Sequence, residues 1–356
     1  MTFTDARRIS ITDPGELIET IPYLLGFHPR ESLVLLGFES TDPVRPMTGT
    51  VQVALRVDLP PDVTEPIDIE PLIEALRGSG ASAVAAVIHS ADVVDPAGPA
   101  GKWSALAEAV SSAVAVADLA LVDLLLSDDS RWWSLICSDP RCCPPTGRAR
   151  AVGCSKAAAQ ATLAGLVALP DREALEAQLD GDTELTRRTL QPHLEQAEHR
   201  VTRAVLSNGV GRLTRVDATA LKKACRDKAA TAVGQPKRLT PEQLARFGVA
   251  LSDIDVRDEL WLAVDDRSLD AGQLMHELLT RLPAPYDAAP LFLYGWHQWR
   301  AGNGTLAAVA AERALESDRG YSAARLLLQA VRSGLAPHKT PYLKDPVPDP
   351  RTGPGG

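Results

Sequence analysis

The residues that decide the fold are DPGELIETIPYLLGFHPRESLVLLGF, positions 13–38. Asp13 is a good N-cap, a proline occupies the first helical position and a glutamate lies three residues after the cap, so a helix is expected to begin here. Apolar residues then recur at helical spacing until Pro22, which should end or kink the helix, and Gly26, which should stop it. Residues 33–36 are apolar without interruption, which is typical of a strand covered on both faces. The stretch therefore predicts a capped helix, a tight turn and a central strand.

Strands and helices alternate from this stretch up to about residue 150. Residues 50–59, TVQVALRVDL, alternate between apolar and polar side chains, which predicts a half-exposed strand. Further strands are expected at 83–89, 119–126 and 131–137, and helices at 71–77 and 102–117. Because such alternation implies crossover connections, the sequence predicts an α/β domain over residues 1–150, with a mixed or mostly parallel sheet and flanking helices. The strand at 131–137 follows its predecessor after a few turn residues, which indicates a hairpin at the sheet edge.

From about residue 148 onward the composition shifts to Ala, Leu, Gln, Glu and Arg, and the chain is expected to be helical. Helices are predicted at 155–167, 171–179, 184–205, 218–233, 241–251, 254–264, 268–282, 290–300, 305–316 and 322–333. Small residues at Ala307 and Ala310, followed by Tyr321, resemble one tetratricopeptide-like helical hairpin; the alternative is that these helices simply pack on their neighbours. We expect a helical domain over 151–335 and, because prolines recur beyond it, a disordered tail over 336–356.

The charge balance argues against most polyanionic partners. The 356 residues carry a net charge of −9 and are 45% hydrophobic, an ordinary globular composition without the basic surface that nucleic-acid or membrane binding needs. One exception is residues 187–238, where twelve Lys and Arg residues stand against four acidic ones, an excess of eight. We expect a solvated helical face that docks on the acidic half of the chain; the alternative is a site for nucleic acid or another polyanion.

The sequence predicts a cytoplasmic protein. Its first residues contain no apolar segment of the kind found in secretory signals, and the most hydrophobic span, 105–126, carries three acidic side chains, so no membrane crossing is expected. The five cysteines are an odd number and are unevenly spaced, unlike a secreted disulfide framework, so we expect reduced thiols.

The most unusual local sequence is RWWSLICSDPRCCPPTG, positions 131–147. Three hypotheses compete for its thiol cluster, Cys137, Cys142 and Cys143. In a structural interpretation Cys137 and the tryptophan side chains are core residues, and packing and proline rigidity hold the loop, since free cysteine is among the most buried residue types. In a redox interpretation Cys142 or Cys143 pairs with Cys137 or with its own neighbour, although no CxxC is present. In a metal interpretation the three thiols bind zinc with Cys154 or His89 as an outside ligand, although CxxxxCC is not a standard zinc spacing. No cofactor is predicted, and zinc is the alternative.

A second candidate site is the LGFHP turn. If the sheet were parallel around the strand at 33–36, a neighbouring loop would bring polar side chains together over an apolar floor. The candidate ligand-binding residues are His28, Ser32, Arg56, Asp58, Arg131 and Trp132. The alternative is that His28 merely caps a turn, because a single histidine with no visible partner does not make a general base.

Several segments occur in an order that identifies a resemblance: the residue 13–38 stretch, then LRVDLP, RWWSLICSDPRCCPPTG, ALPDREAL and the Gly-Trp and Tyr-Ser-Ala-Ala helices. The chain resembles, from residue 9 to about 337, an uncharacterised bacterial family known only as a domain of unknown function (number 4192). The resemblance implies a protein of high-GC Gram-positive bacteria and brings no activity, substrate or cofactor. It also implies a shared pattern without assigned roles, comprising Gly26, Phe27, Pro29, Ser32, Arg56, Asp58, Trp132, Cys142, Cys143 and Gly147.

The sequence contains no phosphate-binding loop, no zinc-protease helix and no serine-hydrolase elbow. We therefore predict a non-catalytic module, with no catalytic residue assigned, that binds a protein partner or a small ligand at the junction of its two halves. The alternative is a cysteine- or metal-dependent enzyme that uses the Cys137–Cys143 loop.

Overall fold

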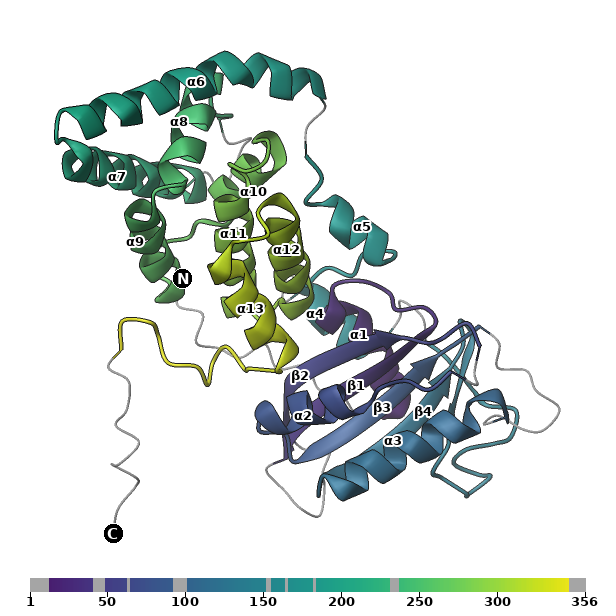
Figure 1. The fold of residues 1–356 in the computed structure, drawn as a ribbon. Coiled ribbons are helices and arrows are strands. Elements are labelled where there is room, and N and C mark those ends of the chain that lie inside the picture. The colour runs from purple at the N-terminus through teal and green to yellow at the C-terminus, as the bar shows by residue number, and fades with distance from the viewer. Residues whose placement is uncertain are drawn as a thin grey trace, which may run out of the picture. The chain divides into compact units, whose positions relative to one another are not determined.

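The computed structural model describes residues 13–40, 49–62, 65–91, 101–151, 155–163, 166–181, 184–230 and 237–345 (Figure 1). The chain divides into two compact units. The sheet unit comprises residues 1–175 and 332–336, and the helical unit comprises 176–331 and 337–356. The predicted combination of an α/β half and a helical half is confirmed. Over the part of the chain that the structure describes, every helix is too short or too polar to cross a bilayer.

The sheet unit contains one six-stranded sheet in the described residues, with the order β2-β1-β3-β4-β5-β6. Its strands are β1 (Ser32–Ser40), β2 (Gly49–Asp58), β3 (Ala83–His89), β4 (Ala120–Ser127), β5 (Arg131–Ser134) and β6 (Arg148–Ala149). Only β3 and β4 pair in parallel, so the sheet is mixed. The hypothesis of a parallel sheet around residues 33–36 is wrong, because β1 is antiparallel to both neighbours. Eight residues join β1 to β2, fewer than a parallel crossover requires.

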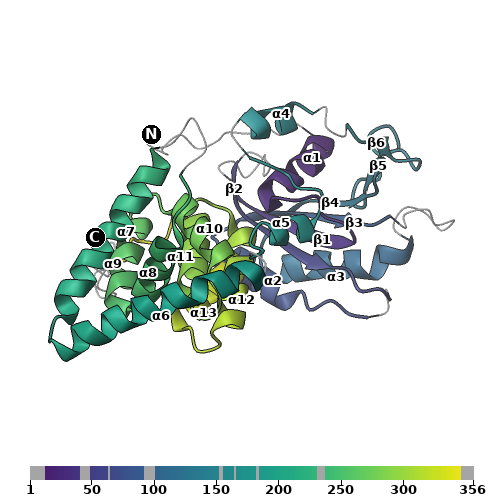
Figure 2. The same cartoon turned by 90° about the horizontal axis from the view of Figure 1, so that it is seen from above.

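Helices cover both faces of the sheet. They are α1 (Pro14–Leu25), α2 (Glu70–Gly78), α3 (Ser104–Val116) and α4 (Lys156–Leu163). The short helix α5 (Arg172–Ala177) follows at the boundary between the two units. Figure 2 shows α1 and α4 on one face and α2 and α3 on the other. Leu33 and Leu35 belong to the core under α2 and α3, and the alternating Val34 and Leu36 face the other way; all four are fully buried. The predicted strand with two covered faces is confirmed.

The predicted ends of α1 are confirmed, and they fix the turn that follows. The carboxylate of Asp13 accepts a hydrogen bond from the backbone N–H of Glu16 at 3.0 Å. Gly26 adopts a φ of 85° and donates its N–H to the carbonyl of Pro22 at 2.8 Å. The helix continues past Pro22 to this cap, because only one internal hydrogen bond is lost so close to its end. Beyond the cap, His28 donates its N–H to the carbonyl of Leu169 at 2.9 Å.

This last contact explains why the sheet unit extends to residue 175 and does not end near 150 as expected. Leu169 also donates its N–H to the carbonyl of Gly26 at 2.9 Å, and α4 packs against α1. The segment after β6 is therefore part of the cover over the α1 face of the sheet.

The helical unit contains α6 to α13 in the described residues. These helices are α6 (Glu184–Leu206), α7 (Val210–Ala229), α8 (Pro241–Leu251), α9 (Ile254–Asp265), α10 (Gly272–Arg281), α11 (Ala288–Arg300), α12 (Gly304–Ser317) and α13 (Ser322–Arg332). Each matches a predicted helix, although α7 begins eight residues before the predicted start. A side chain at Gly295 would come within 3.2 Å of Ala310, so small residues do allow α11 and α12 to approach closely. The likeness of this hairpin to a tetratricopeptide unit stays a prediction.

Residues 337–345 differ from the disordered tail that the prolines suggested. The guanidinium of Arg300, itself 3% exposed, donates to three backbone carbonyls of this segment, those of Pro337, Thr340 and Pro341, at 2.8–2.9 Å. The buried carboxylate of Asp265 pairs with Arg300 and accepts the N–H of Leu343. One buried ion pair thus anchors the segment. Residues 346–356 lie outside the described residues.

Candidate functional site

Polar side chains line up at one edge of the sheet, where the parallel strands β3 and β4 end. The strand register places five residues side by side across this edge. In spatial order they are Asp58, Ser32, His89, Ser127 and Trp132, which we call the edge row. Paired residues on adjacent strands project to the same face, here the one covered by α1. The carboxyl ends of parallel strands are where α/β sheets commonly bind ligands.

His89 lies at the centre of the edge row and is 6% exposed. Its Nε2 atom is buried and has no hydrogen-bond partner among the described residues. Burial, followed by the positive charge of Arg150 and the influence of His28, lowers the pKa of His89 to about 3. The ring is therefore neutral at physiological pH, and one of its nitrogens can form a hydrogen bond that none of the described residues supplies.

A buried ion pair lies on the same face of the sheet, the one covered by α1. Arg150, which follows β6, donates from Nε to the carboxylate of Glu19 on α1 at 2.9 Å, and both side chains are at most 10% exposed. Arg150 also donates to the carbonyl of Asp128, just beyond the end of β4, at 2.8 Å. Partial burial of the ring, followed by the charge of Arg150, lowers the pKa of His28 as well, while the Glu19 carboxylate opposes this shift. Both histidines therefore favour the neutral form.

The predicted group of Ser32, Arg56 and Asp58 is brought together, though by the antiparallel pairing of β1 and β2. Arg56 donates from Nε to the hydroxyl of Ser32 at 2.8 Å, forms an ion pair with Asp58, and lies over the ring of Phe27 at 5.7 Å. Ser32 donates its own hydroxyl to the carbonyl of Arg30 at 2.5 Å. This end of the edge row is thus fully hydrogen-bonded.

The turn before β1 is tied to the residues after β3. Glu31 has a φ of 36° and accepts hydrogen bonds from the hydroxyl of Ser90 at 3.0 Å and the N–H of Ala91 at 2.7 Å. His28 in the same turn is exposed. The turn therefore forms the solvent-facing border of the edge row.

Of the two other predicted site residues, only Trp132 belongs to the edge row. Its ring is buried, and a side chain at Gly15 on α1 would come within 3.1 Å of its Nε1 atom. Arg131 points elsewhere and donates to the carbonyls of Thr146 and Gly147 at 3.0 and 3.1 Å. We assign Arg131 to the support of the cysteine loop.

Sequence reasoning missed four residues of this region. They are Glu19, Ser90, Ser127 and Arg150, while His89 was considered only as a metal ligand. A signal exists for two of them, because Ser127 directly follows a buried apolar run and Ser90 follows one after His89, so both mark the ends of strands. Nothing local marks the pair of Glu19 and Arg150, which are 131 positions apart.

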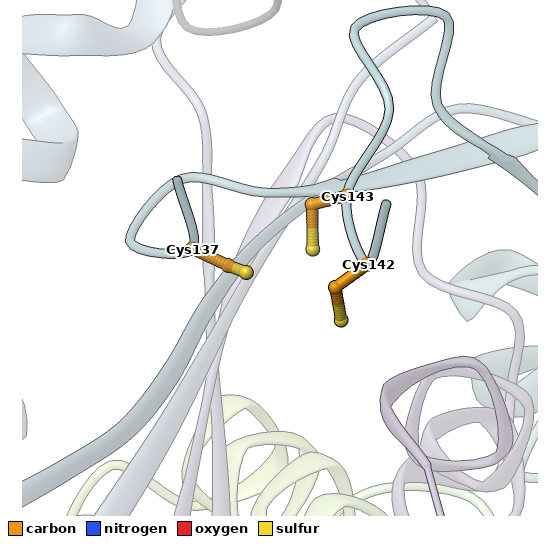
Figure 3. Close-up of side chains that lie close together, drawn as sticks. All are labelled: Cys137, Cys142 and Cys143. Carbon is orange, nitrogen blue, oxygen red and sulfur yellow. The ribbon is translucent and has the colours of Figure 1, made fainter. Parts of the chain in front are cut away.

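The three cysteines of the second candidate site do converge. The sulfur atoms of Cys137, Cys142 and Cys143 all lie within 4.8 Å of one another, and Figure 3 shows Cys137 pointing across the loop toward the other two. All three are free thiols; Cys142 is exposed and the others are half-buried. Cys137 is therefore not the core residue that the structural interpretation expected, whereas Trp132 is buried. His89 is not part of this cluster, and Cys154 lies outside the described residues.

The cluster favours a thiolate at one position. A hydrogen bond from the backbone of Asp139, followed by one from the Cys143 thiol, lowers the pKa of Cys137. Burial, followed by the hydrogen bond with Cys137, raises the pKa of Cys143 to about 12. Cys137 is therefore the more acidic sulfur of this pair.

The basic segment 187–238 forms ion pairs inside the helical unit. Asp217, which is 2% exposed, accepts two hydrogen bonds from Arg200 and two from Arg246 at 2.7–3.0 Å. Buried Lys228 pairs with Glu277 of α10. Part of the positive charge thus holds helices together and does not form a free basic surface.

The comparisons with known proteins agree with the resemblance. A family model described as Domain of unknown function (DUF4192) matches residues 14–338. No curated protein and no solved structure matches the chain.

Proposed function

Because the chain belongs to the DUF4192 family, whose description assigns no activity, we propose a function from the geometry: the sheet unit is a non-catalytic module that binds a small, polar, uncharged molecule at the edge row. The observation that carries this proposal is the buried and unpartnered Nε2 atom of His89. The site lies within the sheet unit, whereas the sequence suggested the junction of the two halves.

An unsatisfied buried polar atom is costly. Leaving such a group without a partner destabilises a fold by about 1–3 kcal/mol, and buried polar groups almost always find one. His89 stands at the carboxyl end of the parallel pair, between the hydroxyls of Ser32 and Ser127. A buried ring nitrogen that lacks a partner among the described residues, at a position where such sheets commonly bind ligands, supports the hypothesis that the partner comes from outside.

The charges around the edge row suggest the chemistry of the ligand. Arg150 is compensated by Glu19, Arg56 by Asp58, and the central histidine is neutral. A charged ligand would leave its own charge without a counterpart in this balanced region. An uncharged or zwitterionic molecule with hydroxyl or amide groups could form a hydrogen bond with the His89 ring. Its affinity should depend little on salt between about 0.05 and about 0.5 M.

The same groups argue for binding without catalysis. A general base works best when its pKa lies near the working pH, and the pKa of His89, about 3, is far below neutrality.

The free thiols of Cys137, Cys142, Cys143 and Cys225 fit a reducing compartment, which supports action in the cytoplasm.

The test is a thermal-shift screen of the full chain against uncharged and zwitterionic metabolites such as sugars, polyols, nucleosides and amino acids, with charged metabolites for comparison. A compound present at about 100 times its dissociation constant should stabilise the sheet unit by about 2.7 kcal/mol, a rise in Tm of roughly 5–10 °C. The His89→Leu variant should lose this rise. Ser111→Ala, which removes a hydroxyl from α3 on the opposite face, should keep it.

Two results would contradict the proposal: a screen without any stabilising uncharged or zwitterionic compound, or compounds that stabilise His89→Leu as much as the wild type. If only charged compounds raised the Tm, the inferred class of ligand would be wrong. A protein partner that binds the wild type and His89→Leu equally, while no metabolite binds, would move the function away from the edge row.

A further inference from the structure

The loop after β5 gathers three thiols that the proposed ligand site does not use. We propose that Cys137, Cys142 and Cys143 bind one zinc ion through their three sulfur atoms. This inference is independent of the edge row and stands on the geometry of the loop.

The distances fit a zinc site. Zinc bonds to cysteine sulfur at about 2.3 Å in tetrahedral geometry, which separates neighbouring sulfurs by about 3.8 Å. The three sulfurs already lie within 4.8 Å of one another. Closing around an ion thus requires each pair to approach by at most about 1 Å, a movement that side-chain rotation can supply.

The backbone of the loop is already folded into a shape that presents the sulfurs. The carbonyl of Asp139 accepts hydrogen bonds from the N–H groups of Cys142 and Cys143 at 3.0 and 2.7 Å, so one tight turn positions both cysteines. The N–H of Cys137 donates to the hydroxyl of Ser134 at 3.2 Å, at the end of β5. Each ligand is therefore held by the strand end or the turn, as a metal site requires.

The far side of the loop is fixed just as firmly. Gly147 has a φ of 71°, and a Cβ atom there would come within 2.4 Å of the Trp133 ring, so only glycine fits. The Trp133 ring donates its N–H to the carbonyl of Pro145 at 3.1 Å. The loop thus keeps its shape through contacts that do not involve the sulfurs.

Arginine side chains hold the backbone of the loop. Arg148 donates from Nε to the carbonyl of Cys142 at 2.5 Å, and Arg131 donates to the carbonyls of Thr146 and Gly147. The guanidinium of Arg141 pairs with Asp139 at 3.2 Å. These contacts fix the segment that carries Cys142 and Cys143.

A zinc site explains three converging thiols better than a disulfide does. The Cα atoms of neighbouring residues lie about 3.8 Å apart, below the usual disulfide range of about 4.4–6.8 Å, which disfavours a bond between Cys142 and Cys143. A bond from Cys137 to either of them would leave the third thiol without a role. Soft thiolates select zinc among the common divalent ions. Among the described residues the cluster offers three sulfur ligands, and a tetrahedral zinc ion takes one ligand more.

The experiment uses the full chain, expressed with zinc in the medium and purified without a metal-binding tag. Elemental analysis should find one zinc per chain. Cys137→Ser, Cys142→Ser and Cys143→Ser should each lower zinc affinity by at least about 100-fold, since the loss of an outer-shell partner alone costs about 10–100-fold. Cys225→Ala, which removes the buried thiol of α7, is the matched control and should keep the ion.

Cobalt substitution tests the wild type without any variant. The near-ultraviolet charge-transfer band of Co²⁺ grows with the number of thiolate ligands and should indicate at least three. A band for two or fewer thiolates, zinc far below one per chain, or a cysteine-to-serine variant that folds and keeps its zinc would overturn the proposal. A mass spectrum of the unreduced protein that shows Cys137 bonded to Cys142 or Cys143 would replace it with a redox pair.

Discussion

Replacement of His89 should change how the stability of the sheet unit depends on pH. Burial lowers the pKa of His89 from 6.5 to about 3 in the folded protein. Below pH 6.5 the unfolded chain therefore binds a proton at His89 that the folded sheet unit does not bind. The free energy of unfolding is not reduced by His89 above about pH 6.5, and it falls progressively as the pH is lowered from 6.5 toward 3.

The size of the effect follows from the shift. Each pH unit inside this window costs about 1.4 kcal/mol of unfolding free energy. At pH 5 the wild type should have lost about 2 kcal/mol relative to pH 7.5 through this histidine alone, and the full window of about 3.5 units corresponds to about 5 kcal/mol. The leucine of His89→Leu cannot bind a proton, so the variant should not show this loss. The stability of the variant should therefore rise relative to that of the wild type as the pH is lowered.

The assay is urea unfolding followed by hydrogen exchange in peptides of β1 and β3, which reports on the sheet unit separately from the helical unit. Other titrating groups cancel in the difference between wild type and variant. His199→Gln, on the exposed surface of α6, is the control and should leave the pH dependence of the sheet unit unchanged. Parallel pH profiles of the wild type and His89→Leu between pH 7.5 and 5 would refute the reasoning.

Three further predictions concern other parts of the structure. Arg150→Met should destabilise the sheet unit by about 3–5 kcal/mol because it leaves the Glu19 carboxylate buried without a partner; urea unfolding measures this loss, and Glu19→Gln in the same chain should restore much of it. Gly147→Ala should cost at least about 1–3 kcal/mol, since its φ of 71° and the adjacent tryptophan ring both oppose a side chain, and it should weaken cobalt binding by the loop; an unchanged Tm would contradict this. Arg300→Met should release residues 337–345, seen as faster hydrogen exchange there, and unaltered protection would show that the ion pair does not anchor them.

The parts of the fold that local chemistry decides could be predicted from the sequence. The cap at Asp13 and the left-handed stop at Gly26 set the ends of α1, and uninterrupted apolar residues identified β1 as a doubly covered strand. Helical periodicity located every described helix from α4 onward, with boundaries shifted by a few residues at most of them. These features depend on neighbouring residues, so a single sequence contains them.

The direction of strand pairing could not be predicted in the same way. Ser32 pairs with Asp58 on one side and His89 on the other, contacts that depend on tertiary packing. Periodicity reports which face of a strand is buried and carries no information about its partner or direction. The structure brings Ser32 and Arg56 together, while the parallel arrangement invoked for them was wrong.

The candidate site was recognisable only in part for related reasons. His89 and Ser127 are polar residues at the ends of apolar strands. This pattern is visible in the sequence and indicates a site at the edge of the sheet. The cysteine spacing, by contrast, matches no standard metal motif, because the turn at Asp139 rather than a regular spacing brings the sulfurs together. Tertiary geometry, which spacing rules do not describe, makes that cluster visible.

The central claim is that the Nε2 atom of His89 receives its hydrogen-bond partner from a bound small molecule. The most direct measurement is a nitrogen–proton correlation spectrum of the histidine rings in ¹⁵N-labelled protein, with His89→Leu to assign the signal, during titration with the metabolites that raise Tm. The account predicts that the Nε2 resonance of His89 moves in a saturable manner with the stabilising compound. A resonance that stays fixed while the compound binds would contradict it.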